Sequence, residues 1–263
     1  MNRLFLLEKR QIPTSIAALI PARAGSTRVK NKNVRLLAGH PLLAWTIATA
    51  KGSGIFDEVY VSTDSQETAD IAERYGTTVP GLRPAEFATS TSPDIGWVAH
   101  TLGGLKADGH DYDAFALLRP TSPFRLPATI KRAWTQFRNG EADSLRAVEK
   151  CEQHPYKMWV VIDESLMEPL FPAAPGRHHW HSSQYQALPE IWVQNASLEI
   201  AWTKTVFDTA SIAGNTVMPF FTCGLEGFDI NFEPDFTEAE RLVESGAAAV
   251  PALLRNELVM AGS

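Results

Sequence analysis

Cysteine is scarce in this sequence of 263 residues, where Cys151 and Cys223 stand far apart and form no CxxC pair. That scarcity excludes a disulfide-rich secreted scaffold, and it predicts two buried, reduced thiols in a cytoplasmic protein. Long hydrophobic runs are also missing, and none approaches the ~20 residues that a membrane-spanning helix requires. The apolar stretch at residues 4–7 is shorter than the core of a signal peptide, about 7–15 residues, so we expect neither export nor membrane association.

An excess of positive charge is absent as well, because 24 Lys and Arg stand against 30 Asp and Glu, giving a formal net charge of −6. This acidity argues against a general nucleic-acid-binding protein, which is usually basic. Residues 9–56 nevertheless contain eight Lys and Arg and no carboxylate. An acidic protein that keeps one long segment free of carboxylates is expected to bind an anion there.

The centre of that basic segment is residues 18–33, ALIPARAGSTRVKNKN, in which an apolar strand turns at Pro21. Gly25 and the hydroxyls of Ser26 and Thr27 follow, and small residues of this kind let backbone N–H groups approach phosphate oxygens. The cations of this segment are Arg23, Arg28, Lys30 and Lys32. The combination predicts a site for a nucleoside triphosphate, and a solvated basic turn is the alternative interpretation.

Two of these cations are the best candidates for contact with phosphates. Arg23 offers a planar fork of donors and Lys32 a movable point charge. For Arg28, Lys30 and Arg35 we favour a solvated cationic face. The spacing matches neither the GxxxxGK[ST] nor the GxGxxG motif, which disfavours a P-loop ATPase and a dehydrogenase.

Strand-like and helical segments alternate along the first 148 residues. The predicted strands are residues 15–20, 58–62, 114–118 and 144–148. The predicted helices begin at Pro41, at Asp64 or Ser65, at Pro93 and at Pro127, and the first, second and last of them end at glycines. This order predicts a mainly parallel sheet with helices on both faces.

The pattern changes after about residue 149, where residues 150–190 are rich in Pro, His and aromatics and are predicted to leave the sheet. The spacing of His178, His179 and His181 within them is loose, which favours a loop over a structural zinc site. The chain then returns as strands at residues 197–202 and 216–220 and a helix at residues 234–244.

Three polar motifs, at residues 22–33, 62–64 and 119–125, each follow a predicted strand. A fourth, at residues 228–231, is predicted to lie near the end of the sheet. Because ligands of α/β sheets bind at the carboxyl ends of the strands, we expect these motifs to meet in one site.

Several of these stretches resemble the acylneuraminate cytidylyltransferase family. IPARAGSTRVKNKN is similar to its IPARGGSKxxxxKN signature, and LRPAEFATSTS, LLRPTSPFR, HPYKMW and FDINFEPDFTEAE follow in the family's order. The resemblance spans most of residues 16–243. It implies a three-layer Rossmann-like nucleotide-diphospho-sugar transferase fold.

The resemblance also implies an organisation of the chain. Residues 1–14 would be an N-terminal extension, and residues 15–149 with 191–263 the nucleotidyltransferase core. Residues 150–190 would be a dimerisation and acceptor-site excursion that crosses to the partner subunit of a homodimer.

The implied reaction joins CTP to a sialic-acid-like sugar acid and releases pyrophosphate, with Mg²⁺ as cofactor. The implied nucleotide-binding residues are Ala22, Arg23, Ser26, Lys32, Asn33, Arg83 and Ser92. Asp229 and Asn231 match a DxD pair that binds Mg²⁺, and Asn231 keeps an oxygen ligand without the charge. Arg23, Lys32 and Asp229 are the implied catalytic residues, with Asp229 the candidate base.

The acceptor site departs most from the family pattern. Arg119 replaces a Gln, Glu199 replaces a Tyr, and Gln184 and Tyr185 stand where arginines are usual. The implied acceptor residues are Arg119, Lys157, Gln186, Asn195 and Glu199. Arg119 and Lys157 could hold a carboxylate, whereas a buried Glu199 would favour an ammonium group or several hydroxyls.

Three alternatives stay open at this point. Arg119 and Glu199 could pair with each other and serve packing alone. The enzyme could use a sugar 1-phosphate or another base, because the acceptor arginines are lost. A non-catalytic nucleotide or sugar binder is the third, because Asn231 weakens the metal site.

Overall fold

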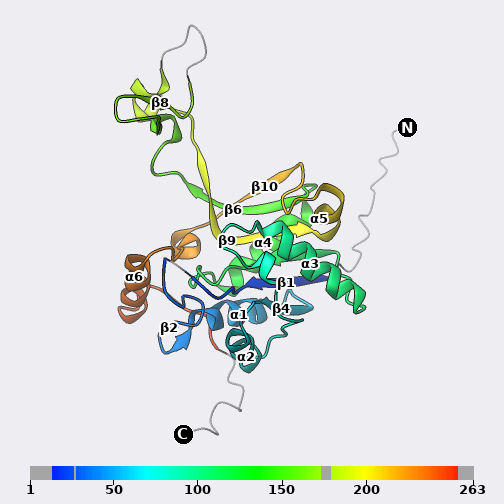
Figure 1. Ribbon diagram of the computed structural model, residues 1–263. Coiled ribbons are helices and arrows are strands. Elements are labelled where there is room, and N and C mark those ends of the chain that lie inside the picture. The colour runs from blue at the N-terminus through cyan, green and yellow to red at the C-terminus, as the bar shows by residue number, and fades with distance from the viewer. Residues whose placement is uncertain (1–13, 27, 173–178, 254–263) are drawn as a thin grey trace, which may run out of the picture.

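The computed structural model describes residues 14–26, 28–172 and 179–253, and at its centre is a six-stranded sheet in the order β10-β6-β9-β5-β1-β4 (Figure 1). Its strands are β1 (Ile16–Pro21), β4 (Glu58–Ser62), β5 (Ala114–Leu117), β6 (Ser144–Lys150), β9 (Trp192–Trp202) and β10 (Val217–Phe221). β9 is antiparallel to its neighbours β5 and β6, and the other neighbouring pairs are parallel. The predicted mainly parallel α/β sheet is confirmed. The expectations for residues 1–13, Thr27 and His178 lie outside the described residues.

Helices cover both faces of this sheet and complete three layers. Their bounds are α1 (Leu42–Ser53), α2 (Gln66–Arg74), α3 (Asp94–Ala107), α4 (Pro127–Asn139), α5 (Thr203–Thr209) and α6 (Glu233–Glu244). Side chains of α1, α2 and α4 join one buried cluster, and those of α3 and α5 join the cluster on the other face. Pro41 and Pro93 directly precede their helices, and Pro127 is the first residue of α4, as the sequence predicts.

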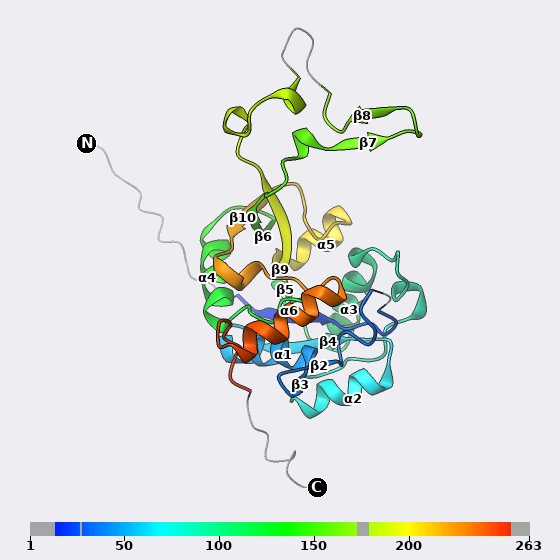
Figure 2. The same cartoon turned by 90° about the vertical axis from the view of Figure 1, so that its left-hand side faces the viewer.

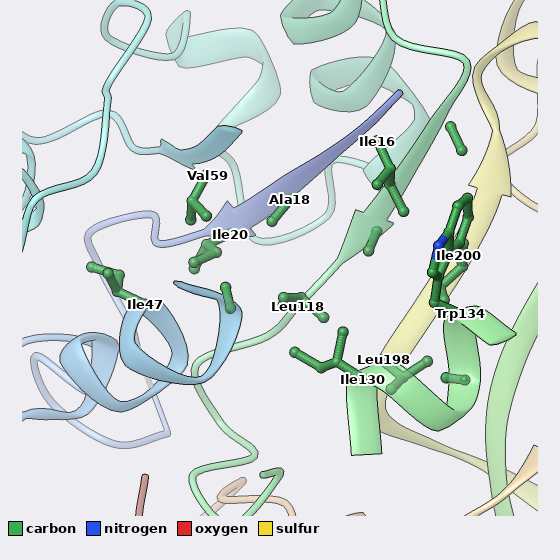
Figure 3. Close-up of a cluster of buried hydrophobic side chains, with 14 of the residues drawn as sticks. Ile16, Ala18, Ile20, Ile47, Val59, Leu118, Ile130, Trp134, Leu198 and Ile200 are labelled. Carbon is green, nitrogen blue, oxygen red and sulfur yellow. The ribbon is translucent and has the colours of Figure 1, made fainter. Parts of the chain in front are cut away.

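Strand β1 shows why its sequence is continuously apolar. Ile16, Ala18 and Ile20 belong to the buried cluster that also contains Ile47 of α1 and Ile130 of α4, and Figure 3 shows Ile20 on the side of Ile47. The alternate residues Ala17 and Leu19 join the cluster on the α3 side. A strand buried on both faces loses the polar alternation of a half-exposed strand.

A third buried cluster fixes the position of residues 228–231. Ile230 is fully buried together with Phe236 of α6 and Leu42 of α1. Asp235 in the first turn of α6 accepts the N–H groups of Asn231 at 2.8 Å and Phe232 at 2.7 Å. This cluster therefore holds the FDIN motif against the start of α1.

The described residues 151–172 and 179–190 lie outside the sheet and project away from it, as Figures 1 and 2 show. They contain a small antiparallel hairpin of β7 (Trp159–Val161) and β8 (Met167–Pro169). The segment also contains the short 3-10 helices η2 (Pro155–Lys157), η3 (Trp180–Ser182) and η4 (Tyr185–Ala187). Two further 3-10 helices, η1 (Ala85–Phe87) and η5 (Gly224–Gly227), lie elsewhere in the chain. The projecting segment exposes large apolar side chains, among them Val161 at 70%.

Some local expectations need correction. Cys151 is half-buried and Cys223 exposed, so the predicted burial of both thiols is wrong, although both are free. β9 begins at Trp192 rather than at residue 197 because its first residues pair with β6 up to Lys150. Helix α5 and the short strands β2 (Leu36–Leu37) and β3 (His40–Pro41) are not predicted from the sequence. Among the described helices, none is long and apolar enough to cross a membrane.

Candidate active site

A cleft of about 390 Å³ lies at the carboxyl ends of β1, β4 and β5. The predicted nucleotide and metal residues that line it are Arg23, Ser26, Lys32, Asn33, Arg83, Ser92, Asp229 and Asn231. Arg119 lies on its wall as well. Three of the four polar motifs, residues 22–33, 119–125 and 228–231, contribute side chains to this cleft. Residues 62–64 do not line it, and Ser62 instead accepts a hydrogen bond from Arg83, which does.

The loop after β1 is braced by two side chains. Asp64 accepts the backbone N–H of Ala24 at 2.7 Å, and Asn33 donates from Nδ2 to the Arg23 carbonyl at 3.1 Å. Gly25 has a φ of +72°, in the left-handed region that favours glycine. These contacts hold the start of the loop beside the cleft.

Ala22 differs from its predicted role. It is fully buried and does not line the cleft, and its N–H donates to the Ser62 carbonyl at 2.9 Å. The residue anchors the start of the loop to β4, so the nucleotide contacts predicted for this loop fall to the residues after it.

Lys32 connects the loop to the FDIN motif. Its Nζ donates to the Ile230 carbonyl at 2.8 Å. Burial lowers the pKa of Lys32; Asp229 opposes this shift, whereas the nearby charges of Arg28 and Arg23 add to it. A lysine with a lowered pKa among other cations is typical of a site that awaits an anion.

Arg83 is held by the protein on several sides. Its Nε donates to the Ser62 hydroxyl at 3.0 Å and its Nη2 to the Ser62 carbonyl at 2.9 Å. The guanidinium lies 4.5 Å from the centre of the Trp97 ring. Burial lowers the pKa of Arg83 to about 10, against the opposing charges of Asp64 and Asp94. These contacts fix Arg83 in the wall of the cleft. Ser92, which also lines the cleft, donates its hydroxyl to the Glu86 carbonyl at 2.7 Å.

Asp229 and Asn231 form the part of the cleft that suits a cation. Asn231 donates from Nδ2 to Asp229 Oδ2 at 2.6 Å, and Asp229 Oδ1 is buried without a hydrogen-bond partner in the described structure. The described residues contain no group of three or more His, Cys, Asp and Glu that could hold a metal ion. One orphaned carboxylate oxygen beside an amide fits Mg²⁺, which takes few protein ligands together with phosphate oxygens and water.

A second cleft of about 820 Å³ adjoins the first and shares Arg119, Ala196, Asp229 and Asn231 with it. Its other lining residues are Glu149, Glu152, Val193, Gln194, Asn195, Gly224, Leu225, Gly227, Phe228 and Asp235. A compound bound in one cleft is therefore adjacent to a compound bound in the other.

One polar cluster shapes the second cleft. Asn195 donates from Nδ2 to Glu149 at 3.1 Å and to the Thr222 hydroxyl at 2.9 Å. A Cβ on Gly227 would collide with Glu149 and Asn195, which explains a glycine at this position.

The predicted acceptor residues do not all reach this cleft. Arg119 and Asn195 line it, whereas Glu199 is buried behind Arg119, at hydrogen-bond distance of 2.9 Å, and lines neither cleft. Lys157 donates to the carbonyls of His181 and Ser183 in the excursion, and Gln186 is exposed there. Within the same chain, neither of these two residues lines either cleft.

Sequence reasoning missed Asp94, which lines the first cleft and binds Arg119 Nη2 at 2.8 Å. Burial alone would raise the pKa of Asp94, but the charge and hydrogen bond of Arg119 and the indole N–H of Trp97 outweigh it and lower that pKa. An Asp after Pro93 looks like an ordinary residue of a first helical turn, so the sequence held no separate signal for it.

The fold and the site together define a nucleotide-binding transferase of the α/β class, and comparisons with known proteins agree. A family model described as cytidylyltransferase matches residues 17–92. CMP-N,N'-diacetyllegionaminic acid synthase of Legionella pneumophila is 34% identical over 236 residues, which are 89% of this chain and 99% of that protein. The chain belongs to the acylneuraminate cytidylyltransferase family.

Two further comparisons agree with this assignment. N-acylneuraminate cytidylyltransferase of Escherichia coli is 46% identical over 112 residues, which are 43% of this chain and 26% of that longer protein. The solved structure of CMP:2-keto-3-deoxy-manno-octonic acid synthetase complexed with CTP superimposes with a TM-score of 0.66 at 11% identity. It covers 89% of this chain and 100% of that one, and at this identity it supports the fold alone.

Proposed function

We propose that this protein transfers CMP from CTP to a sialic-acid-like sugar acid. The observation that carries the proposal is the pair of adjoining clefts with Asp229 in the wall of both. The first cleft presents Arg23 and Lys32 to a polyphosphate, and the second has the room for a nine-carbon sugar. The activities by which the Legionella and Escherichia coli relatives are named support CTP and a sugar acid as the substrates.

The reaction needs one substitution at phosphorus. A hydroxyl oxygen of the sugar forms a bond to the α-phosphorus of CTP, and the bond from that phosphorus to the bridging oxygen of the β-phosphate breaks. The leaving pyrophosphate takes the electron pair, and the hydroxyl proton passes to Asp229 Oδ2, because Oδ1 is the oxygen assigned to the metal. Arg23 and Lys32 neutralise the charge that develops on the pyrophosphate, so the protein acts mainly by positioning and electrostatics.

The proposal includes Mg²⁺, for which Asp229 Oδ1 and the amide oxygen of Asn231 are the protein ligands. When bound, the ion would neutralise charge on the triphosphate. Asn231 supplies an oxygen without a charge, so this pair would bind the ion more weakly than two carboxylates, and the triphosphate would have to contribute ligands as well.

The same proposal includes a homodimer in which the excursion of residues 150–190 lies against the partner subunit. Trp159, Val160, Val161 and Ile162 are between 39% and 70% exposed in the single chain. Contiguous apolar surface of this kind favours burial in an interface.

A pyrophosphate-release assay tests the function. Purified protein is given each of the four nucleoside triphosphates with N,N'-diacetyllegionaminic acid, N-acetylneuraminic acid or a sugar 1-phosphate. We expect release with CTP and a sugar acid, and poor use of N-acetylneuraminic acid because Arg119 and Glu199 alter the acceptor side. Release that depends on a sugar 1-phosphate, or no release with CTP and any sugar acid, would overturn the proposal.

A further inference from the structure

Arg119 is locked between two carboxylates at the junction of the two clefts. Its Nη2 donates to Asp94 Oδ2 at 2.8 Å and to Glu199 Oε1 at 2.9 Å, which uses both protons of that nitrogen. Each contact fixes the guanidinium plane from a different element, because Asp94 begins α3 and Glu199 lies in β9. Arg119 therefore has one orientation relative to both clefts.

Glu199 is itself held from its far side. Its Oε2 lies 2.5 Å from Arg146 Nη1, and its side chain is only 7% exposed. In the sheet, Glu199 is directly opposite Arg146 of β6 and Leu117 of β5, two residues before Arg119. A buried carboxylate between two arginines cannot rotate away without leaving a charge unpaired, so it acts as a fixed support.

Arg119 keeps further donors, and its side chain is 27% exposed where the residue lines both clefts. Its Nε and Nη1 make no hydrogen bond to any described residue, and neither belongs to the buried atoms that lack a partner. The guanidinium thus keeps donors that reach bound compounds while Nη2 is occupied.

The second cleft is otherwise acidic. Among its described lining residues Arg119 is the one cation, and the carboxylates are Glu149, Glu152, Asp229 and Asp235. A negatively charged group that enters this cleft is repelled by most of its wall and attracted at one point.

We propose, building on the function proposed above, that Arg119 binds the carboxylate of the sugar acid through Nη1, and that Glu199 is the positioning residue that aims it. A charge-assisted hydrogen bond to Arg119, the one cation among the described residues of this cleft, fixes the orientation of the acceptor. The sugar hydroxyl is then presented toward Asp229 and the first cleft. Asp94 supports the same guanidinium from the nucleotide side.

The test compares N,N'-diacetyllegionaminic acid with its neutral methyl ester at saturating CTP. We expect wild type to prefer the acid. Arg119→Gln is expected to raise KM for the acid by about 10- to 100-fold, remove the preference for the acid and leave KM for CTP within about threefold. Arg119→Lys keeps the charge and is expected to retain part of the preference.

Glu199→Gln tests the positioning role, because it keeps the shape of the side chain and removes the charge. We expect a raised acceptor KM with an unchanged CTP affinity by calorimetry, which also reports that the variant is folded. Arg241→Gln, which breaks the exposed pair of Arg241 and Glu238 on α6, is the matched control and is expected to change neither KM.

Each outcome separates the proposals. An Arg119→Gln variant that keeps the preference for the acid would show that Arg119 does not bind the carboxylate, and one that loses CTP affinity instead would show that Arg119 contacts the nucleotide. Either result would overturn this inference alone. A Glu199→Gln variant with wild-type acceptor KM would remove the positioning role. If the wild-type protein releases pyrophosphate from CTP with none of the sugar acids, the proposed function itself is overturned.

Discussion

Lys32 Nζ and the carbonyl oxygen of Ile230 are 2.8 Å apart, although 198 residues separate them in the chain. This bond joins the basic loop after β1 to the motif that carries Asp229. The phosphate side and the metal side of the cleft are thereby held as one unit, and the following predictions address each of them.

Arg23→Ala should reduce kcat of CMP transfer strongly. Arg23 lines the first cleft, and loss of a donor that stabilises the leaving pyrophosphate costs about 2–4 kcal/mol by analogy with oxyanion donors. Lys30→Ala removes an exposed charge from the same loop and serves as the control, with a small expected effect. Near-normal turnover of Arg23→Ala in a pyrophosphate-release assay would contradict the assignment of the loop.

CTP affinity should fall on the alkaline side as Lys32 loses its proton. Burial lowers the pKa of Lys32 below its usual 10.5, so the charged form that binds phosphate is lost at a lower pH than for an exposed lysine. Lys32→Arg should keep its affinity to higher pH because arginine stays protonated. Calorimetric titration of both proteins between about pH 8 and pH 10 checks this, and parallel curves would refute it.

The sign of the accompanying stability effect follows from the same lowered pKa. Above the folded-state pKa of Lys32 and below 10.5, the unfolded chain binds more protons than the folded one. This contribution to the free energy of unfolding therefore increases as pH rises through that window. Lys32→Met should remove that slope in chemical denaturation at a series of pH values.

The metal side of the cleft should respond in opposite directions to two changes. Asn231→Asp adds a charge beside Asp229 and should lower the Mg²⁺ concentration needed for half-maximal activity. Asp229→Asn removes the orphaned carboxylate and should raise that concentration or abolish turnover. Titration of Mg²⁺ at fixed CTP measures both, and identical Mg²⁺ curves for the three proteins would exclude this site.

Gly227→Ala should damage the second cleft selectively. The added Cβ would collide with Glu149 and Asn195, which costs about 1–3 kcal/mol of stability and displaces acceptor-side groups. Gly103→Ala in α3 has no neighbour within 4 Å of the new Cβ and should instead stabilise the helix by about 0.5–1 kcal/mol. Thermal unfolding separates the two variants, and an unchanged acceptor KM in Gly227→Ala would place the acceptor elsewhere.

The proposed dimer predicts that Val161→Asp shifts the protein toward monomer. Val161 is 70% exposed in the excursion, and a buried charge in an apolar interface is costly. Phe207→Asp changes a residue of α5 that is 51% exposed and is the control for a surface charge. Sedimentation or light scattering at micromolar concentration reports the mass, and a wild-type monomer would refute the dimer.

The order of elements and the nucleotide side of the site could be predicted because their signals are local. Strand β1 is buried on both faces and its loop follows directly, so residues 16–33 contain both the strand and the cations that line the cleft. The support of Arg119 could not be predicted in full. Asp94, Arg146 and Glu199 lie on three elements far apart in the chain, and only the pairing of β6 with β9 and the position of α3 bring them together.

The acceptor residues show the same limit. Lys157 and Gln186 match a family pattern in sequence, yet the excursion carries them away from both clefts of their own chain. The sequence motif identifies these residues, but the path of an irregular segment depends on the surfaces that pack against it.

Strand β9 leads directly from the excursion into the wall between the two clefts. Because β6 and β9 pair on either side of residues 151–191, their register is set within the sheet and not by the length of the segment that joins them. Insertions, deletions and new sequence in that segment can therefore accumulate without moving Ala196 or Glu199. The architecture thus separates a segment whose length can vary from a sheet whose register holds the walls of both clefts in place.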